Sequence, residues 1–377
     1  LPFGRMHGLT AAGGFHGWRP AGARTGNCME YEVRIPGIGK SFKVRNKETI
    51  LSAALRHKIS LEFKCGNGSC KTCLSNLLKG SVEYPFRRPT ALSEEDVAHG
   101  RILTCQAVPL SDVELDARVR TGLMEEVRLH ELKSALDGIS VRQGTATVTG
   151  IERAAHDVTI VRLEPDDLPN WLPGQYLTLS ARGLHRDFSI ASLPGRDPYF
   201  ELQIRTVPRG RLTGWISDGM KAGDVVSWEG PLGTFFHRIN SKRPILVVAG
   251  GTGFSPAKAV IESAMRKGAS KPIRLYWGVR ARRDLYAMGV TEQWALNGDF
   301  TFIPVLSDPL AGDDWPGETG YVHEAVARTE KSLAGFDIYI AGPPAMVEAA
   351  FGTVKAKGAR VDRIFTDSFE FSPNLSA

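Results

Sequence analysis

The stretch Cys65-Gly-Asn-Gly-Ser-Cys70-Lys-Thr-Cys73 places three cysteines in one short loop, and a fourth, Cys105, follows after a long gap. Iron–sulfur clusters of the [2Fe–2S] type use this C-x4-C-x2-C spacing with a distant fourth thiolate. Zinc motifs instead favour two short pairs of Cys or His ligands, and no second pair or nearby His follows here. A disulfide framework is also disfavoured, because a chain of 377 residues with five cysteines needs no covalent cross-links. We therefore predict that these four cysteines bind a [2Fe–2S] cluster.

The residues around the cysteine loop have the pattern of a small α+β domain. Two strands, YEVRIPG and SFKVRN, are joined by a glycine turn and precede a helix that Thr49 is placed to cap. Beyond the loop come a strand, a short helix opened by Ser93, and two further strands, the first of which carries Cys105. Residues 29–117 resemble a plant-type ferredoxin domain, which implies a β-grasp fold around the cluster.

Length and composition limit the classes of protein to which the chain can belong. With 377 residues it exceeds one ordinary core, so two or three domains are expected. Hydrophobic residues make up 42% and charged residues 23%, as in ordinary soluble globular proteins. No apolar run approaches the ~20 residues that cross a bilayer, so no membrane anchor is predicted. The net charge of +6 is small and forms no basic stripe, which argues against nucleic-acid binding.

Two segments lie outside the predicted domains. Residues 1–28 are rich in Gly and Ala, contain no acidic residue and precede Met29, so we expect a non-native or disordered N-terminal extension. Residues 118–143 form a linker. Apolar residues between Leu123 and Leu136 are spaced for an amphipathic helix, although a linker that merely packs on its neighbours fits equally well.

Residues 144–240 show the strand–turn alternation of a small closed barrel. Two polar runs interrupt it: Arg186-Asp187-Phe188-Ser189 on one edge strand, and Gly210-Arg211-Leu212-Thr213 at the start of a helix whose N–H groups can hold a phosphate. Either run alone would more often be a surface ion pair or a capped helix. Together and in this order they resemble the ferredoxin–NADP reductase family, which carries R-x-Y-[ST] on a barrel strand and G-x-x-[ST] at the next helix.

The resemblance implies a six-stranded antiparallel barrel that binds FAD. Arg186 would contact the pyrophosphate, Phe188 would lie beside the flavin and ribityl region, and Ser189, the predicted catalytic residue, would place its hydroxyl near flavin N5. The other half of the pyrophosphate would be held by Gly210, Arg211, Leu212 and Thr213. Phe188 stands where the family usually has Tyr, so a hydroxyl contact to the cofactor is lost.

Residues 241–377 alternate strands and helices, which predicts a Rossmann-like parallel sheet. A nearly wholly apolar strand is followed by Gly251-Thr252-Gly253 and then by a helix, the context in which glycine turns bind dinucleotides. Gly342-Pro343-Pro344 follows another predicted strand, so it is expected to face the same crevice. The resemblance to the reductase family extends to this region, with Ala341 in place of the usual Cys before Gly-Pro-Pro.

The choice of nicotinamide dinucleotide depends on the loop Arg280-Ala281-Arg282-Arg283-Asp284. A 2′-phosphate would require one or two arginines, which Arg282 and Arg283 could supply. Gly-x-Arg followed by Asp-Leu-Tyr instead resembles the NADH-using relatives, so we predict NADH, with NADPH as the alternative. In the tail, Phe369 or Phe371 is expected either to stack on the flavin, as terminal aromatics do in this family, or to pack in the core.

An N-terminal ferredoxin on this architecture resembles the reductase components of bacterial aromatic-ring-hydroxylating dioxygenases. The resemblance implies electron transfer from NADH through FAD and [2Fe–2S] to a terminal oxygenase or a separate ferredoxin, because NADH gives an electron pair whereas the cluster takes single electrons. Reductases of soluble di-iron monooxygenases or of deoxysugar synthesis are the close alternatives. A non-catalytic redox-sensing protein is less well supported, because every cofactor motif is present. We expect a cytoplasmic bacterial monomer that binds neither nucleic acid nor membranes.

Overall fold

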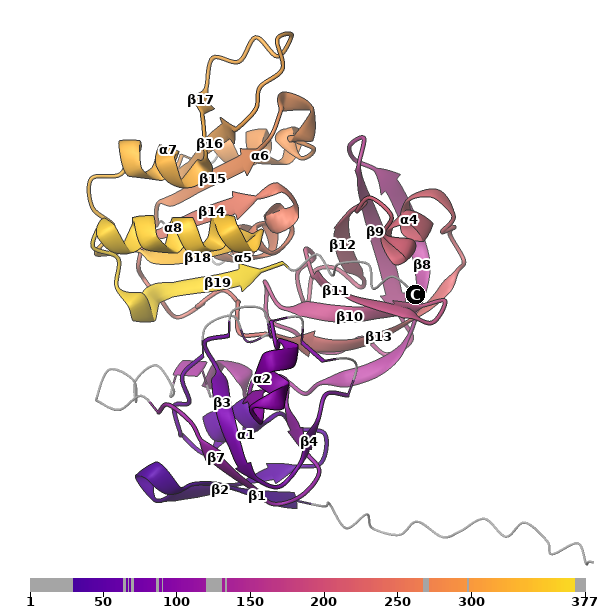
Figure 1. The fold of residues 1–377 in the computed structure, drawn as a ribbon. Coiled ribbons are helices and arrows are strands. Elements are labelled where there is room, and N and C mark those ends of the chain that lie inside the picture. Colours follow the sequence, from indigo (N-terminus) through magenta and orange to yellow (C-terminus); the bar gives the residue numbers. More distant parts are fainter. Residues whose placement is uncertain are drawn as a thin grey trace, which may run out of the picture.

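The computed structural model describes residues 30–63, 66, 68, 71–85, 88, 89, 91–119, 131, 132, 134–266, 271–296 and 298–369. These residues form three modules in chain order, each built on its own sheet (Figure 1). The predictions for residues 1–28, Cys65, Cys70, Leu123 and Phe371 lie outside the described residues. Within the described part, no helix combines the length and the apolar character that a membrane span requires.

The first module is a small mixed sheet with two short helices. Its elements are β1 (Glu30–Ile35), β2 (Lys40–Arg45), α1 (Ile50–Arg56), β3 (Leu74–Lys79), β4 (Val82–Glu83), α2 (Glu94–Ala98), β5 (Arg101–Leu103), β6 (Val108–Pro109) and β7 (Val113–Asp116). Five strands follow the order β2-β1-β7-β3-β5, in which β1 and β7 are parallel and the other pairs are antiparallel. This is the predicted β-grasp ferredoxin fold.

Local sequence signals place both helices of this module. Thr49 precedes α1, and its hydroxyl accepts a hydrogen bond from the Ser52 N–H at 3.2 Å, as the N-cap prediction requires. Ser93 caps α2 in a reciprocal pair with Asp96. The described residues at the end of the linker, 131, 132 and 134–136, are helical, and Leu132 lies buried in the ferredoxin core. These linker residues therefore form a helix that packs on the first module.

The second module is an antiparallel barrel of six strands. Its elements are β8 (Arg142–Arg153), β9 (Val158–Pro165), β10 (Tyr176–Ala181), β11 (Leu184–Ser189), β12 (Phe200–Arg205), α4 (Arg211–Asp218) and β13 (Val225–Leu232). The strand order is β11-β10-β13-β8-β9-β12, and a bridge between Ile190 and Leu202 joins the two ends of this order. Inside, the ring of Phe200 makes edge-on contacts with Trp171 and Trp228. The prediction of a six-stranded barrel is confirmed.

The third module is a parallel sheet with helices on both faces. Its elements are β14 (Ile245–Gly250), η2 (Gly251–Gly253), α5 (Phe254–Arg266), β15 (Ile273–Val279), η3 (Arg282–Asp284), α6 (Met288–Ala295), β16 (Phe300–Leu306), β17 (Glu318–Thr319), α7 (Val322–Thr329), β18 (Asp337–Gly342), α8 (Pro344–Ala356) and β19 (Ile364–Ser368). The strand order is β17-β16-β15-β14-β18-β19. Alternate residues of β14 enter the α5/α6 core and the α7/α8 core, which explains why this strand is apolar throughout.

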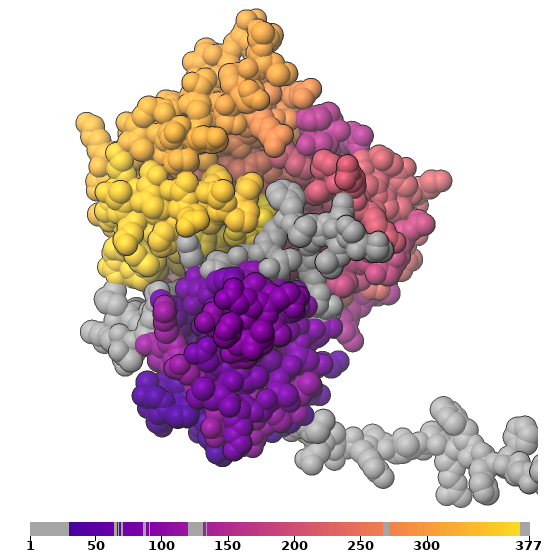
Figure 2. All heavy atoms as spheres, viewed as in Figure 1, coloured from indigo at the N-terminus to yellow at the C-terminus, as the bar shows by residue number. Residues whose placement is uncertain are grey.

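The modules pack directly on one another, and the ferredoxin lies beneath the other two in Figure 2. Between barrel and nucleotide-binding module, the Ser255 hydroxyl donates to the backbone oxygen of Ser189 at 2.9 Å. Lys258 Nζ lies 3.3 Å from Glu201 Oε1 in the same buried interface. These contacts fix α5, the helix that follows the glycine turn, against the barrel.

Candidate functional site

Two of the four predicted cluster ligands lie among the described residues, and the fold brings them together. Cys73 directly precedes β3 and Cys105 follows β5 closely, and these two strands pair antiparallel through Leu74 and Leu103. Both thiols are buried, and their Sγ atoms lie 3.1 Å apart. This separation is well beyond the ~2.05 Å of a disulfide bond, so the two thiols lie side by side, as two ligands of one metal centre would. Cys65 and Cys70 belong to the part of the loop that the structure does not describe.

The loop between the first cysteines needs glycine at two positions. Gly66 and Gly68 have φ values of +74° and +87°, where L-residues are strained. A Cβ atom at Gly68 would also lie 2.9 Å from Pro89 Cβ. The side-chain amide of Gln106, the neighbour of Cys105, donates to the Gly66 carbonyl at 3.1 Å. Glycines with positive φ beside two buried thiols fit the tight loop that holds a [2Fe–2S] cluster.

The predicted flavin-binding residues lie on β11, at the edge of the barrel that faces the third module. Arg186 and Phe188 are half-buried, and Ser189, at the strand end, is only 8% exposed. Arg186 Nη1 donates to the backbone oxygen of His185 at 2.6 Å. The Ser189 hydroxyl donates to Asp367 Oδ2 on β19 at 3.1 Å. The predicted catalytic serine therefore lies where barrel and nucleotide-binding module meet.

Asp367 is a functional candidate that the sequence analysis missed. It is buried among the residues of β19, and burial raises the pKa of its carboxyl group to about 7, with the Ser189 hydrogen bond lowering it and the charge of Asp187 raising it further. Such a carboxyl group can hold a proton near neutral pH. The one signal in the sequence is an acidic residue in the last strand, two positions before Phe369.

Helix α4 begins at the second predicted flavin-binding run. Gly210 is its N-cap residue, and an added Cβ at this position would overlap the Thr213 hydroxyl group. Leu212 and Thr213 are buried, whereas Arg211 is exposed. The Thr213 hydroxyl accepts a hydrogen bond from the Val207 N–H at 3.1 Å, so it closes the turn that leads into the helix. The helix leaves its first N–H groups available to an anion, which fits the pyrophosphate of FAD.

A cavity of about 680 Å³ opens between the third module and the rim of the barrel. Gly251 and Pro343, two of the predicted dinucleotide-binding residues, line it. Thr252, Gly253 and Gly342 are not among the lining residues. Instead, Gly253 allows close packing, because a Cβ there would overlap the carbonyl oxygen of Ala341. Thr252, Gly253 and Gly342 thus belong to the chain segments that present the lining residues Gly251 and Pro343.

Arg205 enters the same cavity from the barrel, and the sequence analysis did not single it out. It ends β12, and a Cβ at Gly251 would lie 2.7 Å from its Nη1 atom. Its guanidinium group thus lies against the glycine turn that precedes α5, where the anionic part of a dinucleotide binds. Asp157 holds Arg205 through a 3.0 Å ion pair between Oδ2 and Nε. Arg205 therefore places a guanidinium group, which can donate to phosphate oxygens, beside this turn.

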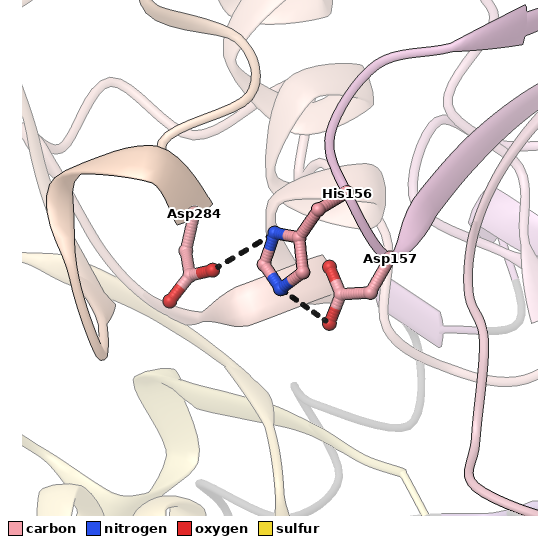
Figure 3. A group of neighbouring side chains, drawn as sticks. All are labelled: His156, Asp157 and Asp284. Carbon is pink, nitrogen blue, oxygen red and sulfur yellow. Dashed lines mark ion pairs between the residues drawn. The ribbon is translucent and has the colours of Figure 1, made fainter.

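His156, which lines this cavity, lies between two carboxylates (Figure 3). Its Nε2 atom is 3.9 Å from Asp157 Oδ2 on the barrel, and its Nδ1 atom is 3.7 Å from Asp284 Oδ1 in η3. Asp284 is held by the Ala281 N–H at 3.0 Å. This cluster joins barrel and nucleotide-binding module, and no sequence pattern singled it out because its residues come from two distant turns.

The two arginines proposed for a 2′-phosphate lie differently. Arg283 lines the cavity, but Arg282 is directed to Asp313, whose backbone oxygen accepts from Arg282 Nη1 at 3.2 Å. Arg280 and Asp308 also line the cavity. In the tail, Phe369 is half-buried and its N–H donates to the Gly342 carbonyl at 2.9 Å, so stacking of Phe369 on the flavin stays a prediction.

Three family models match the chain in the order of its modules. They are described as a 2Fe-2S iron-sulfur cluster binding domain, which matches residues 33–110, an oxidoreductase FAD-binding domain, which matches residues 145–237, and an oxidoreductase NAD-binding domain, which matches residues 247–351. The predicted cofactors, a [2Fe–2S] cluster, FAD and a nicotinamide dinucleotide, are thereby confirmed, and so is an oxidoreductase.

Relatives match nearly the whole chain. The CDP-6-deoxy-L-threo-D-glycero-4-hexulose-3-dehydrase reductase of Yersinia pseudotuberculosis is 34% identical and is aligned over 90% of this chain and 99% of its own. The phenol 2-monooxygenase reductase component DmpP of Pseudomonas sp. is 31% identical over 90% and 95%. The crystal structure of the Amycolatopsis cytochrome P450 reductase GcoB superimposes with a TM-score of 0.69, at 32% identity over 90% and 98%. The chain belongs to the family of iron–sulfur flavoprotein reductases, in which a plant-type ferredoxin domain is joined to a ferredoxin–NADP reductase-like flavoprotein.

Proposed function

We propose that this chain takes electrons from NADH and passes them through FAD and a [2Fe–2S] cluster to a partner oxygenase, or to that oxygenase's ferredoxin. The observation that supports this most is the continuity of the three sites. Gly66 in the cysteine loop lies against Thr234 beyond β13, and Ser189 on the barrel edge meets Asp367 beside the nucleotide-binding module. When bound, FAD supplies the chemistry that links the two-electron transfer of a hydride to single-electron transfers.

The residues of the chain have distinct roles in this proposal. Arg186 and the start of α4, from Gly210 to Thr213, hold the pyrophosphate of FAD, since guanidinium and helix N–H groups both favour phosphate oxygens. Ser189 and Asp367 form a hydrogen-bonded pair that holds a proton at the wall shared by the two modules. Cys65, Cys70, Cys73 and Cys105 hold the cluster.

NADH is the proposed donor. Arg205 from the barrel and Gly251 from η2 would receive its pyrophosphate, because both line the cavity and the guanidinium group lies against the glycine turn. Asp308 also lines this cavity, and its negative charge would disfavour an additional 2′-phosphate by like-charge repulsion. Arg280 and Arg283 also line the cavity, and their positive charges would favour a 2′-phosphate. NADPH is therefore the alternative donor.

The electron acceptor is proposed at the level of a protein class. An aromatic-ring-hydroxylating dioxygenase is the first choice, and a di-iron monooxygenase or a deoxysugar-forming dehydrase are the alternatives. The similarity to a dehydrase reductase and to a phenol monooxygenase reductase component supports the alternatives directly. We further propose a monomer of the bacterial cytoplasm, divided into a ferredoxin at 29–117, a linker at 118–143, a flavin module at 144–240 and a nucleotide module at 241–377.

Two artificial acceptors test the proposed path. Ferricyanide takes electrons from the flavin, whereas cytochrome c takes them from the cluster. Cys105→Ser is expected to abolish NADH-dependent reduction of cytochrome c, with loss of bound iron, and to leave FAD content and ferricyanide reduction intact. Cys28→Ser, which changes a cysteine outside the predicted ligand set, is the matched control and keeps both rates. The proposal fails if native protein contains zinc and no iron, or if Cys105→Ser reduces cytochrome c at the native rate.

A further inference from the structure

The segment Thr234-Phe-Phe-His-Arg238, between β13 and β14, contacts all three modules. Phe235 enters the core of the nucleotide-binding module, where its ring lies 5.6 Å from that of Tyr339. The next residue, Phe236, is fully buried in the core cluster of the ferredoxin. Consecutive side chains of an extended segment point to opposite sides, so the segment joins two hydrophobic cores that are remote in sequence.

Arg238 fixes this segment to β19, the last strand among the described residues. Its guanidinium carbon lies 3.7 Å from the ring centre of Phe236 and 4.2 Å from that of Phe365 on β19. Its Nη1 and Nη2 atoms donate to the backbone oxygens of Phe236 and Thr234 at 3.0 and 3.1 Å. Its own N–H donates to the Tyr339 hydroxyl at 2.9 Å. The planar guanidinium group of Arg238 thus stacks between Phe236, which packs in the ferredoxin core, and Phe365 on the strand that carries Asp367.

The same segment reaches the cysteine loop. A Cβ atom at Gly66 would lie 3.3 Å from the Thr234 hydroxyl oxygen, so the loop backbone rests on Thr234. The Gly66 carbonyl is bonded to the side chain of Gln106, next to Cys105. Arg238, by holding the Thr234 carbonyl, therefore fixes the surface on which the cluster loop rests.

We propose that Arg238 is a positioning residue that holds the cluster loop of the ferredoxin against the flavoprotein, and thereby sets the geometry of electron transfer between the two. The inference rests on the proposed electron-transfer function. The contacts of Arg238 described above are with Thr234, Phe236, Tyr339 and Phe365 rather than with predicted cofactor-binding residues. Its effect passes through Thr234 and Phe236 on one side and through Phe365 on the other.

The test compares variants of the full chain loaded with FAD and iron. Arg238→Ala removes the stack and both side-chain hydrogen bonds. Arg238→Lys keeps the charge but not the planar fork, and it is expected to behave in the same way. Arg243→Ala, which removes another arginine of the same connecting segment, is the matched control. Phe236→Leu keeps an apolar side chain in the ferredoxin core but removes the ring beneath the guanidinium group, so it probes the same contact if Arg238→Ala folds poorly.

We expect NADH-dependent reduction of cytochrome c to fall at least about tenfold in Arg238→Ala, as small displacements of reacting groups can cost that much, while ferricyanide reduction and cofactor content are unchanged. Amide hydrogen exchange, which does not depend on turnover, should rise in residues 102–110 and 234–238 and stay at the native level in Arg243→Ala. Native cytochrome c rates and native exchange in Arg238→Ala and Phe236→Leu would overturn the inference. Parallel loss of both activities with loss of FAD would overturn it too. A failure of the proposed function would appear instead in the native chain, which would not reduce cytochrome c.

Discussion

At the scale of single residues, Asp367 shows how burial prepares a side chain for proton chemistry. Its carboxyl group accepts a hydrogen bond from Ser189, which favours the charged form, but burial outweighs this contact and raises the pKa to about 7. In the unfolded chain the same group titrates near its usual value of 3.8. Between these two values the folded chain holds one proton more than the unfolded chain.

Asp367→Asn is therefore expected to change how stability depends on pH. In the native chain, the stability that comes from the protonated carboxyl group is complete below about pH 4, where both states hold the proton, and it is lost as the pH rises from about 4 toward about 7, at roughly 1.4 kcal/mol for each pH unit. Asn carries no charge at any pH, so the variant loses this slope and becomes more stable relative to the native chain near neutrality. Urea unfolding of both proteins between pH 4 and 8 measures the effect. Parallel pH profiles would contradict the assigned pKa.

Arg186 provides a second test at this scale. Arg186→Ala is expected to weaken FAD binding by about 1.5–3 kcal/mol, or roughly tenfold to a hundredfold, because a charge-assisted contact to a phosphate is lost. Flavin retained after extensive dialysis measures the effect, and added FAD should partly restore NADH–ferricyanide activity. Arg162→Ala, an exposed arginine of the same barrel, is the control and retains its flavin. If Arg186→Ala kept its full flavin content, the Arg186 side chain would have no role in FAD binding.

At the scale of elements, the strand–turn–helix unit β14–η2–α5 depends on close approach between two strand ends. Gly253→Ala should destabilise the nucleotide-binding module by about 1–3 kcal/mol, because the new Cβ would overlap the backbone oxygen of Ala341, which cannot move freely. Gly352→Ala in α8, where a Cβ meets nothing within 4 Å, is the control and should gain up to about 1 kcal/mol of helix propensity. Thermal unfolding of both variants decides, and equal midpoints would contradict the packing argument.

Variants in the loop after β15 test the choice between NADH and NADPH. The native chain is expected to prefer NADH over NADPH by at least about tenfold in kcat/KM. Arg283→Ala should lower the remaining NADPH rate further, whereas Arg282→Ala should alter neither rate, because Arg282 is directed to Asp313. Steady-state rates with each nucleotide measure both effects. A native preference for NADPH that collapses in Arg283→Ala would reverse the assignment.

At the scale of the whole molecule, the sequence predicted what depends on local pattern. The cysteine spacing, the Thr49 and Ser93 caps, the strand alternation of the barrel and the apolar run of β14 each follow from neighbours in the chain, and the structure has all of them. Contacts between modules were not predictable in this way. The contact of Asp367 with Ser189 and the packing of Phe236 in the ferredoxin core each join residues of different modules. The residue pattern within one segment does not predict which residue of another module it will contact.

The central claim is that one chain connects NADH to the [2Fe–2S] cluster through FAD. An anaerobic titration with NADH, followed by visible absorption and by the electron paramagnetic resonance of the cluster, tests it most directly. We predict that the cluster signal develops as the flavin absorption bleaches, and that Cys105→Ser shows the bleaching without the signal. Bleaching of the native flavin by NADH with a cluster that only dithionite can reduce would contradict the claim.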